Sequence, residues 1–84
     1  MELKNIKFED FKNYLTDNFV FGFTATLRKN TIIHSFIRFF NNNELKMKVK
    51  VNRDTKCIES VFVDDKTYID LEKVKTIVER KRKI

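Results

Sequence analysis

The segment NELKMKVKV, at residues 43–51, alternates between apolar and charged side chains. Its apolar residues fall on one side and its lysines on the other: Leu45, Met47, Val49 and Val51 against Lys46, Lys48 and Lys50. This period of two is typical of a half-buried β-strand, because successive side chains of a strand point to opposite faces. A lone strand is not stable in water, so the segment requires partner strands and an apolar layer over one face.

The region from Phe19 to Val63 is rich in β-branched and aromatic residues and is broken by short polar turns. Its strand-like runs are FVFGFTATL, IIHSFIRFF, ELKMKVKVN and CIESVFV, separated by RKNT, NNN and RDTK. Runs of roughly eight residues with connections of about two to four predict a four-stranded antiparallel meander. Gly22, inside the first run, predicts a bulge or a close approach of another backbone.

Helical periodicity appears on both sides of this region. Residues 6–17 place Phe8, Phe11 and Leu15 on one face, and the C-terminal segment does the same with Leu71, Val74, Ile77 and Val78. Asp70 is in position to cap the second helix. The chain of 84 residues has room for a single core. The sequence therefore predicts one α+β domain over residues 1–84, a four-stranded antiparallel sheet flanked by an N-terminal and a C-terminal helix (α-β-β-β-β-α).

The composition limits the class of protein and its expected location in the cell. The chain has no proline and one glycine, which is not the composition of a linker or a disordered segment. Cys57 is the only cysteine, so no intrachain disulfide forms, and its place beside Ile58 suggests a small core residue. No apolar run approaches the roughly 20 residues of a membrane span, and the N-terminus lacks the apolar region of a signal peptide. We expect a cytoplasmic protein with no membrane contact.

The net charge is +6 at pH 7 and is unevenly distributed. Residues 20–63 carry eight basic against three acidic residues, a net of +5. A second group of basic residues closes the chain: Arg80, Lys81, Arg82 and Lys83. This distribution favours an anionic partner, although a positive charge of this size also serves solubility alone.

The strand at residues 32–40 has two faces, and the lengths of its flanking loops decide which one is buried. Burying His34 and Arg38 without partners would cost on the order of 2–5 kcal/mol. We therefore expect three-residue loops at 29–31 and 41–43, which bury the odd-numbered side chains of the strand. The solvent-facing side would then display rings and cations from three strands: Thr24, Thr26, Arg28, His34, Phe36, Arg38, Phe40, Lys46, Lys48 and Lys50.

Such a face has two interpretations. Exposed rings stack on unpaired bases while Lys and Arg contact phosphates, as on the sheet face of RNA-recognition motifs, although no motif of that family is present here. Alternatively, Phe36 and Phe40 belong to the core or to a dimer seam. The three lysines also have a second interpretation, because charged side chains on an outer strand prevent sheets from pairing edge to edge.

Signals for catalysis are weak. One histidine and one cysteine do not make a zinc site, and a single glycine does not make a phosphate-binding loop. Glu44-Leu45-Lys46 has the E-x-K spacing of one class of metal-dependent nucleases, to which Asp17 or Asp64 would add a carboxylate. The Pro-Asp element of that class is missing. We expect a non-enzymatic protein without catalytic residues, metal or cofactor.

Two functions of different classes follow. The first is a small basic nucleic-acid-binding protein, with single strands favoured. Its contacts would be Arg28, His34, Phe36, Arg38, Phe40, Lys46, Lys48, Lys50 and the Arg80–Lys83 cluster. The second is an inhibitor or adaptor that binds an anionic protein or nucleoprotein surface, such as an anti-defence protein encoded on a phage or plasmid. A homodimer through the same face is a third option.

Overall fold

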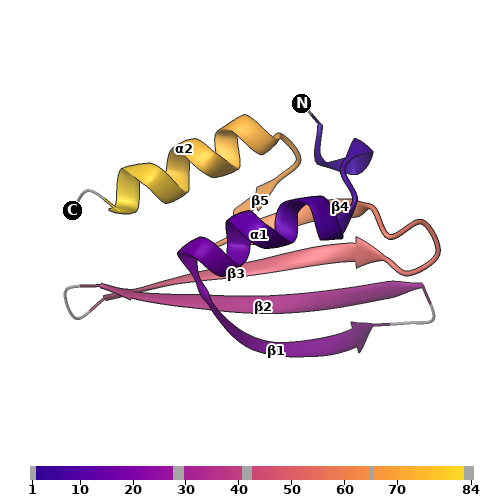
Figure 1. Ribbon diagram of the computed structural model, residues 1–84, viewed down its shortest axis with the longest axis horizontal. Coiled ribbons are helices and arrows are strands. Elements are labelled where there is room, and N and C mark those ends of the chain that lie inside the picture. The colour runs from indigo at the N-terminus through magenta and orange to yellow at the C-terminus, as the bar shows by residue number, and fades with distance from the viewer. Residues whose placement is uncertain (1, 28–29, 41–42, 65, 83–84) are drawn as a thin grey trace.

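The computed structural model describes residues 2–27, 30–40, 43–64 and 66–82 (Figure 1). Its elements, in chain order, are η1 (Leu3–Asn5), α1 (Phe8–Asn18), β1 (Val20–Leu27), β2 (Thr31–Phe40), β3 (Asn43–Asn52), β4 (Ile58–Val63), β5 (Lys66–Tyr68) and α2 (Leu71–Arg82). The predicted α-β-β-β-β-α order is confirmed. Two short elements were not predicted, the 3-10 turn η1 and the strand β5.

The strands form one open antiparallel sheet in the order β1-β2-β3-β4-β5, so every strand pairs with its neighbours in the sequence. The predicted meander is therefore confirmed and extended by β5. The register of β1 against β2 shifts between Phe21 and Phe23, which confirms the bulge predicted at Gly22. A glycine is well suited there because it has no side chain to hold against the partner strand.

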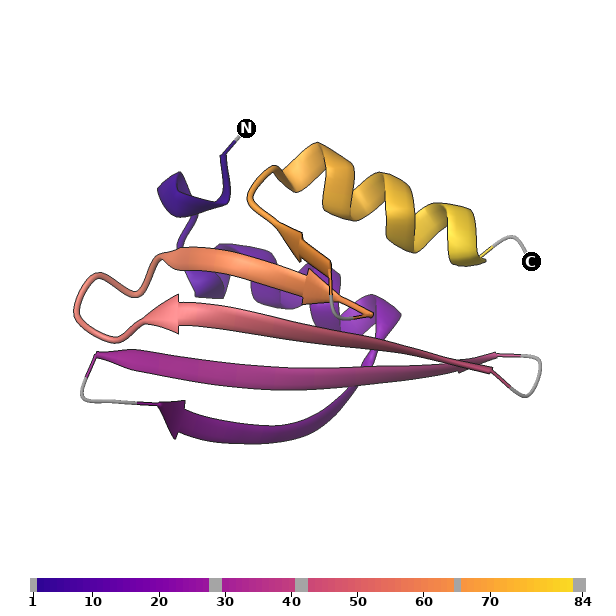
Figure 2. The ribbon, with the colours of Figure 1, turned by 180° about the vertical axis from the view of Figure 1, so that it is seen from behind.

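The apolar layer lies on one side of the sheet. Helix α1 crosses that side, and α2 lies along the edge formed by β5 (Figure 1). Seen from behind, the sheet lies in front of α1 and shows its opposite side (Figure 2). One cluster of buried side chains joins both helices to the middle strands: Leu3, Phe11, Leu15, Phe19, Phe36, Leu45, Met47, Val49, Val51, Ile58, Val61, Val63, Val74 and Val78. The sheet thus has a helix-covered face and an open face.

The two ends of the domain are tied together. Leu3 is completely buried, and its N–H donates to the carbonyl of Ile69 at 2.9 Å. Glu2 and Asp70 form an isolated antiparallel bridge at the same place. The Asp70 carboxylate accepts a hydrogen bond from the N–H of Glu72 at 2.9 Å, which confirms the predicted helix cap.

Candidate functional site

The register of β2 against β3 decides which side chains share the open face. Phe36 pairs with Met47, and His34 pairs with Val49, so the even-numbered residues of β2 lie on the helix-covered face. Phe36 is 3% exposed and belongs to the core. The prediction that the odd-numbered side chains of β2 are buried under the helices is therefore wrong, and Phe36 is not available for stacking on a base.

The physical reason lies in the position of the polar residues along β2. On the helix-covered face, Phe36 at the middle of the strand is buried, whereas His34 and Arg38, two residues away on either side, are half-buried. Half-burial leaves part of each side chain in contact with water, although Arg38 Nη1 is buried and has no hydrogen-bond partner among the described residues. The expected penalty for burying both therefore does not arise in full. The pairing of Phe40 with Asn43 leaves a two-residue connection where three residues were expected.

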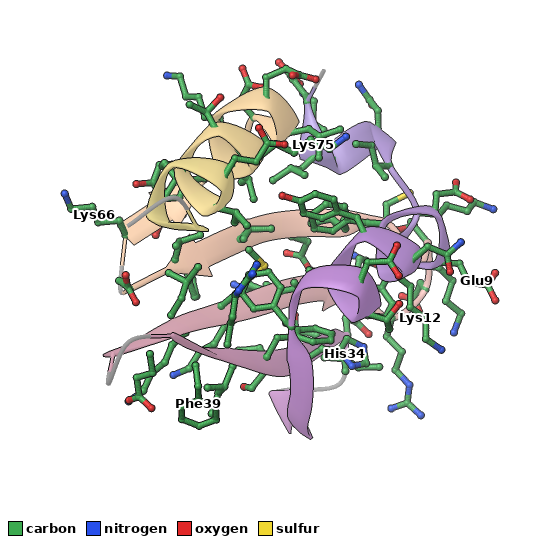
Figure 3. The ribbon with its side chains drawn as sticks, turned by 60° about the vertical axis from the view of Figure 1, so that its left-hand side comes forward. Glu9, Lys12, His34, Phe39, Lys66 and Lys75 are labelled. Atoms are coloured by element: carbon green, nitrogen blue, oxygen red, sulfur yellow. The ribbon has the colours of Figure 1, made fainter. Side chains whose placement is uncertain are left out.

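The three lysines Lys46, Lys48 and Lys50, hereafter the lysine row, lie on the open face as predicted. Their partners on β2 are Ile37, Ser35 and Ile33, and Lys48 also pairs with Phe62 on β4. Phe39, paired with Glu44, is 70% exposed. Figure 3 shows Phe39 on the side of the sheet opposite to the helices. The lysine row therefore has a half-buried ring beside it on β4, and an exposed ring on β2 lies just beyond its Lys46 end, opposite Glu44.

A shallow hollow of about 350 Å³ lies at one end of the lysine row. Its lining comprises Glu44, Lys46, Lys48, Phe62 and Asp64. The Lys46 ammonium pairs with the Glu44 carboxylate at 3.2 Å, and the backbone N–H of Lys46 donates to Asp64 Oδ1 at 3.3 Å. Glu44, Lys46 and Asp64 are thus brought together as the E-x-K hypothesis required, whereas Asp17 is not part of the hollow. In the described part of the chain, no three acidic, histidine or cysteine residues gather as a metal site would need.

A second concave feature lies at the other end of the sheet, on the helix-covered side. This basic groove, of about 410 Å³, lies between the start of α1, the ends of β2 and β3, and the turn that follows β3. Its described lining contains four cations and one carboxylate: Lys7, Lys12, Arg53 and Lys56 against Glu9. Apolar and aromatic contact comes from Phe8, Ile32, His34 and Val51. None of the four cations was predicted as a site residue.

The turn that carries Arg53 and Lys56 is held by hydrogen bonds around Asn52. The side-chain oxygen of Asn52 accepts from the N–H groups of Asp54 and Thr55, at 2.9 and 3.0 Å. Lys56 has a left-handed backbone (φ 66°), and its carbonyl accepts from the N–H of Phe8 at 2.8 Å. Because these bonds join the turn to the start of α1, both walls of the basic groove are fixed relative to each other.

His34 forms the inner wall of the basic groove. Its ring stacks on Phe8, with centroids 4.2 Å apart and planes 9° from parallel. Burial lowers the pKa of His34 below its usual value, and the nearby Lys12 ammonium lowers it further. The imidazole is therefore neutral at pH 7, and the positive charge of the basic groove comes from its lysines and its arginine.

The remaining predicted site residues are only partly described. Arg28 and Lys83 lie outside the described residues, as do the side chains of Phe40, Arg80, Lys81 and Arg82. Arg38 is half-buried on the helix-covered face. Sequence reasoning missed Phe39 because the expected register of β2 was shifted by one residue, and it did not consider Phe62 on β4. A correct two-residue loop at 41 and 42 would have found Phe39, and Phe62 follows from the alternation of β4.

The described helices include none with the length and apolar character needed to cross a bilayer. Cys57 is a free cysteine that forms the isolated bridge with Lys7. It is only half-buried, whereas a small core residue was predicted at this position.

Comparisons with protein-family models, with curated proteins and with solved structures found no match.

Proposed function

We propose that the protein binds single-stranded nucleic acid on the open face of its sheet. The observation that carries this proposal is the lysine row, with Phe62 beside Lys48 and Phe39 just beyond Lys46, on a face that none of the described helices covers. Lysines contact phosphates without regard to sequence, and exposed rings stack on unpaired bases for roughly 1–3 kcal/mol per base. Phe39 and Phe62 replace the rings expected from the sequence.

A second candidate is supported by the apolar side of the same face. Half-buried Ile33 and Ile37 adjoin Phe39 on β2, next to the lysine row. Contiguous exposed apolar residues are typical of surfaces that contact another protein. An inhibitor or adaptor would use this face against an acidic surface with an apolar centre, and a second copy of the chain is the simplest such partner to test.

The first experiment measures fluorescence anisotropy of labelled single-stranded DNA, duplex DNA and RNA, at low and near-physiological salt. We expect single strands to bind more tightly than duplex. Changing the lysine row to glutamine (Lys46→Gln, Lys48→Gln and Lys50→Gln together) should lower the salt dependence of binding, with a slope smaller by about 2, because each phosphate contact on a single strand contributes about 0.7.

The matched control removes the same charge elsewhere. Lys4, Lys66 and Lys73 are exposed and lie outside both the open-face site and the basic groove. Their combined change to glutamine should leave the slope much closer to that of the parent. If both triple variants lose affinity equally, only the net charge matters and the lysine row is not a site. If the parent binds none of the three nucleic acids at low salt, the protein-partner candidate takes precedence.

A further inference from the structure

The basic groove concentrates positive charge from segments far apart in the sequence. Lys7 immediately precedes α1 and Lys12 lies in the first half of that helix, whereas Arg53 and Lys56 come from the turn between β3 and β4. Figure 1 shows that this turn and the beginning of α1 lie at the same end of the sheet. With Glu9 as the one acid in its described lining, the groove carries a net charge of about +3. Like charges held together in this way favour an anion of more than one charge.

The uncharged lining of the basic groove narrows the class of ligand further. Phe8, His34, Ile32 and Val51 offer aromatic and aliphatic contact beside the cations. A volume of about 410 Å³ is within the range of small-molecule sites. A hydrated inorganic anion would use the cations and leave the rings unused. A phosphate joined to a planar ring would use both.

We propose that the basic groove binds a nucleotide. Its phosphate would lie between the cations Lys7, Lys12, Arg53 and Lys56, and its base against the Phe8–His34 pair. This site is separate from the open face, because it lies on the helix-covered side of the sheet and takes its cations from the region of α1 and the β3–β4 turn. The same chemistry has two sources, a free nucleotide or the phosphorylated end of a nucleic-acid strand.

The backbone of Lys56 gives independent support. Residues with φ near 66° are usually glycine or asparagine, because a side chain makes this conformation unfavourable. A lysine at this position is a local cost to the fold, and such costs gather at functional sites. Replacing it with glycine should relieve that cost while removing one cation from the groove, so stability and binding are expected to change in opposite directions.

The test is an NMR titration of the full chain with adenosine monophosphate, inorganic phosphate and adenosine. His34 is the only histidine, so its imidazole signals report on the groove without ambiguity. Adenosine monophosphate should give saturable shifts of His34 and of the 52–57 turn, with an affinity above that of either fragment. Lys56→Gly and Arg53→Gln should each weaken it by about tenfold, the loss of one charged hydrogen bond. For Lys56→Gly, the midpoint of urea unfolding should be unchanged or higher.

Two control variants separate this site from others. Lys66→Gln removes an exposed lysine away from the basic groove, and Lys48→Gln removes one from the lysine row. Both should bind adenosine monophosphate as the parent does. Failure of the parent to show saturable shifts at millimolar nucleotide would overturn the proposal. So would full binding by the Arg53→Gln and Lys56→Gly variants, or equal affinity for inorganic phosphate and adenosine monophosphate.

Oligonucleotides with and without a terminal phosphate identify the source. Tighter binding of the phosphorylated strand, with the difference lost in Lys56→Gly, assigns the groove to a strand end. Equal binding of the two strands, together with saturable binding of adenosine monophosphate, assigns it to a free nucleotide. The triple lysine-row variant tests the two proposals separately. If it still binds adenosine monophosphate, nucleotide binding by the basic groove does not depend on the open face, and the groove proposal holds even where the open-face proposal fails.

Discussion

At the scale of single residues, two phenylalanines close together on β2 have opposite roles. Phe36 is 3% exposed and Phe39 is 70% exposed, because the alternation of the strand sends one toward the helices and the other away from them. Composition alone makes the two equivalent. Their different exposure depends on the register of β2. Substitutions at the two positions should therefore have different effects on stability and on binding.

We predict that Phe36→Ala destabilises the fold by about 3–5 kcal/mol, because it leaves a cavity in the core. Since a domain of this size has limited stability to lose, Phe36→Leu serves as a milder variant with an expected loss of about 1 kcal/mol. Phe39→Ala should change the free energy of unfolding by less than about 0.5 kcal/mol. Urea unfolding followed by circular dichroism gives all three values. A large loss for Phe39→Ala would contradict the register of β2.

Phe39→Ala should instead weaken the binding of single-stranded nucleic acid, by about fivefold or more, because stacking on one base is worth roughly 1 kcal/mol at least. Duplex binding should change little, since paired bases do not present their faces. The anisotropy assay measures both. Equal losses on single strands and duplex would mean that Phe39 does not stack.

His34 makes stability depend on pH in a defined direction. Its pKa is lowered in the fold, so the folded protein favours the neutral imidazole. The corresponding stability is present above the ordinary pKa of about 6.5 and is lost as the pH falls from there toward the folded pKa. Lys7, Lys12, Arg53 and Lys56 all oppose protonation, and Glu9 is the acid in the described lining that favours it.

We therefore predict that the free energy of unfolding falls as the pH is lowered below about 6.5, and that the fall is smaller in His34→Gln. Carboxylates titrate in both proteins, so their contribution cancels in the comparison. An NMR titration of the His34 ring measures the folded pKa directly. A value above 6.5 would reverse the sign and contradict the account given for the groove.

At the scale of elements, the turn from β3 to β4 is ordered by one side chain. Asn52 accepts hydrogen bonds from two backbone N–H groups, and the carbonyl of Lys56 then accepts from the first residue of α1. The five-residue turn at 53–57 thereby becomes a fixed wall of the basic groove. Local side-chain bonds of this kind are favoured by asparagine because its amide oxygen reaches the backbone two residues ahead.

We predict that Asn52→Ala costs about 1 kcal/mol of stability, because two backbone donors then depend on water. The same change should weaken nucleotide binding, since Arg53 and Lys56 lose their fixed position. Asn13→Ala, on the exposed side of α1, is the matched control and should lower neither quantity. Hydrogen exchange at Asp54 and Thr55 measures the local effect. Unchanged exchange in Asn52→Ala would show that the turn is ordered by other contacts.

At the scale of the whole molecule, the fold is closed by contacts between its two ends. Leu3 enters the core and donates to Ile69, just before α2 begins. The sequence does not predict η1, because three residues of 3-10 helix carry no periodic signal. Closure of this kind makes the N-terminal residues part of the cooperative unit.

We predict that Leu3→Ala lowers the free energy of unfolding by about 2–5 kcal/mol, as expected for a fully buried leucine. Ile69→Ala, at a position that is 64% exposed, should change it by about 0.5 kcal/mol or less. Urea unfolding monitored by fluorescence and by circular dichroism should give coincident transitions for both. A small effect of Leu3→Ala would mean that the N-terminal turn is not part of the core.

The sequence by itself determined the four longer strands and the two α-helices. Period-two alternation and short polar turns predicted the four long strands, helical spacing predicted α1 and α2, and Asp70 predicted where α2 begins. These signals are local, because each depends on residues within one element or one turn. The lysine row was also visible for this reason.

Only the tertiary structure decided which side chains share a face of the sheet and which cations lie together. The connection between β2 and β3 has two residues where three were predicted, and this difference of one residue exchanges the two faces of β2. Connections of two and of three residues are both common in β-hairpins, so the turn sequence does not decide between them. The basic groove could be found only in the folded structure. Its four cations are spread over residues 7 to 56, and they come together because the β3–β4 turn is hydrogen-bonded to the start of α1. Proximity of that kind leaves no periodic trace in a sequence, since it depends on how elements pack and not on how each one forms.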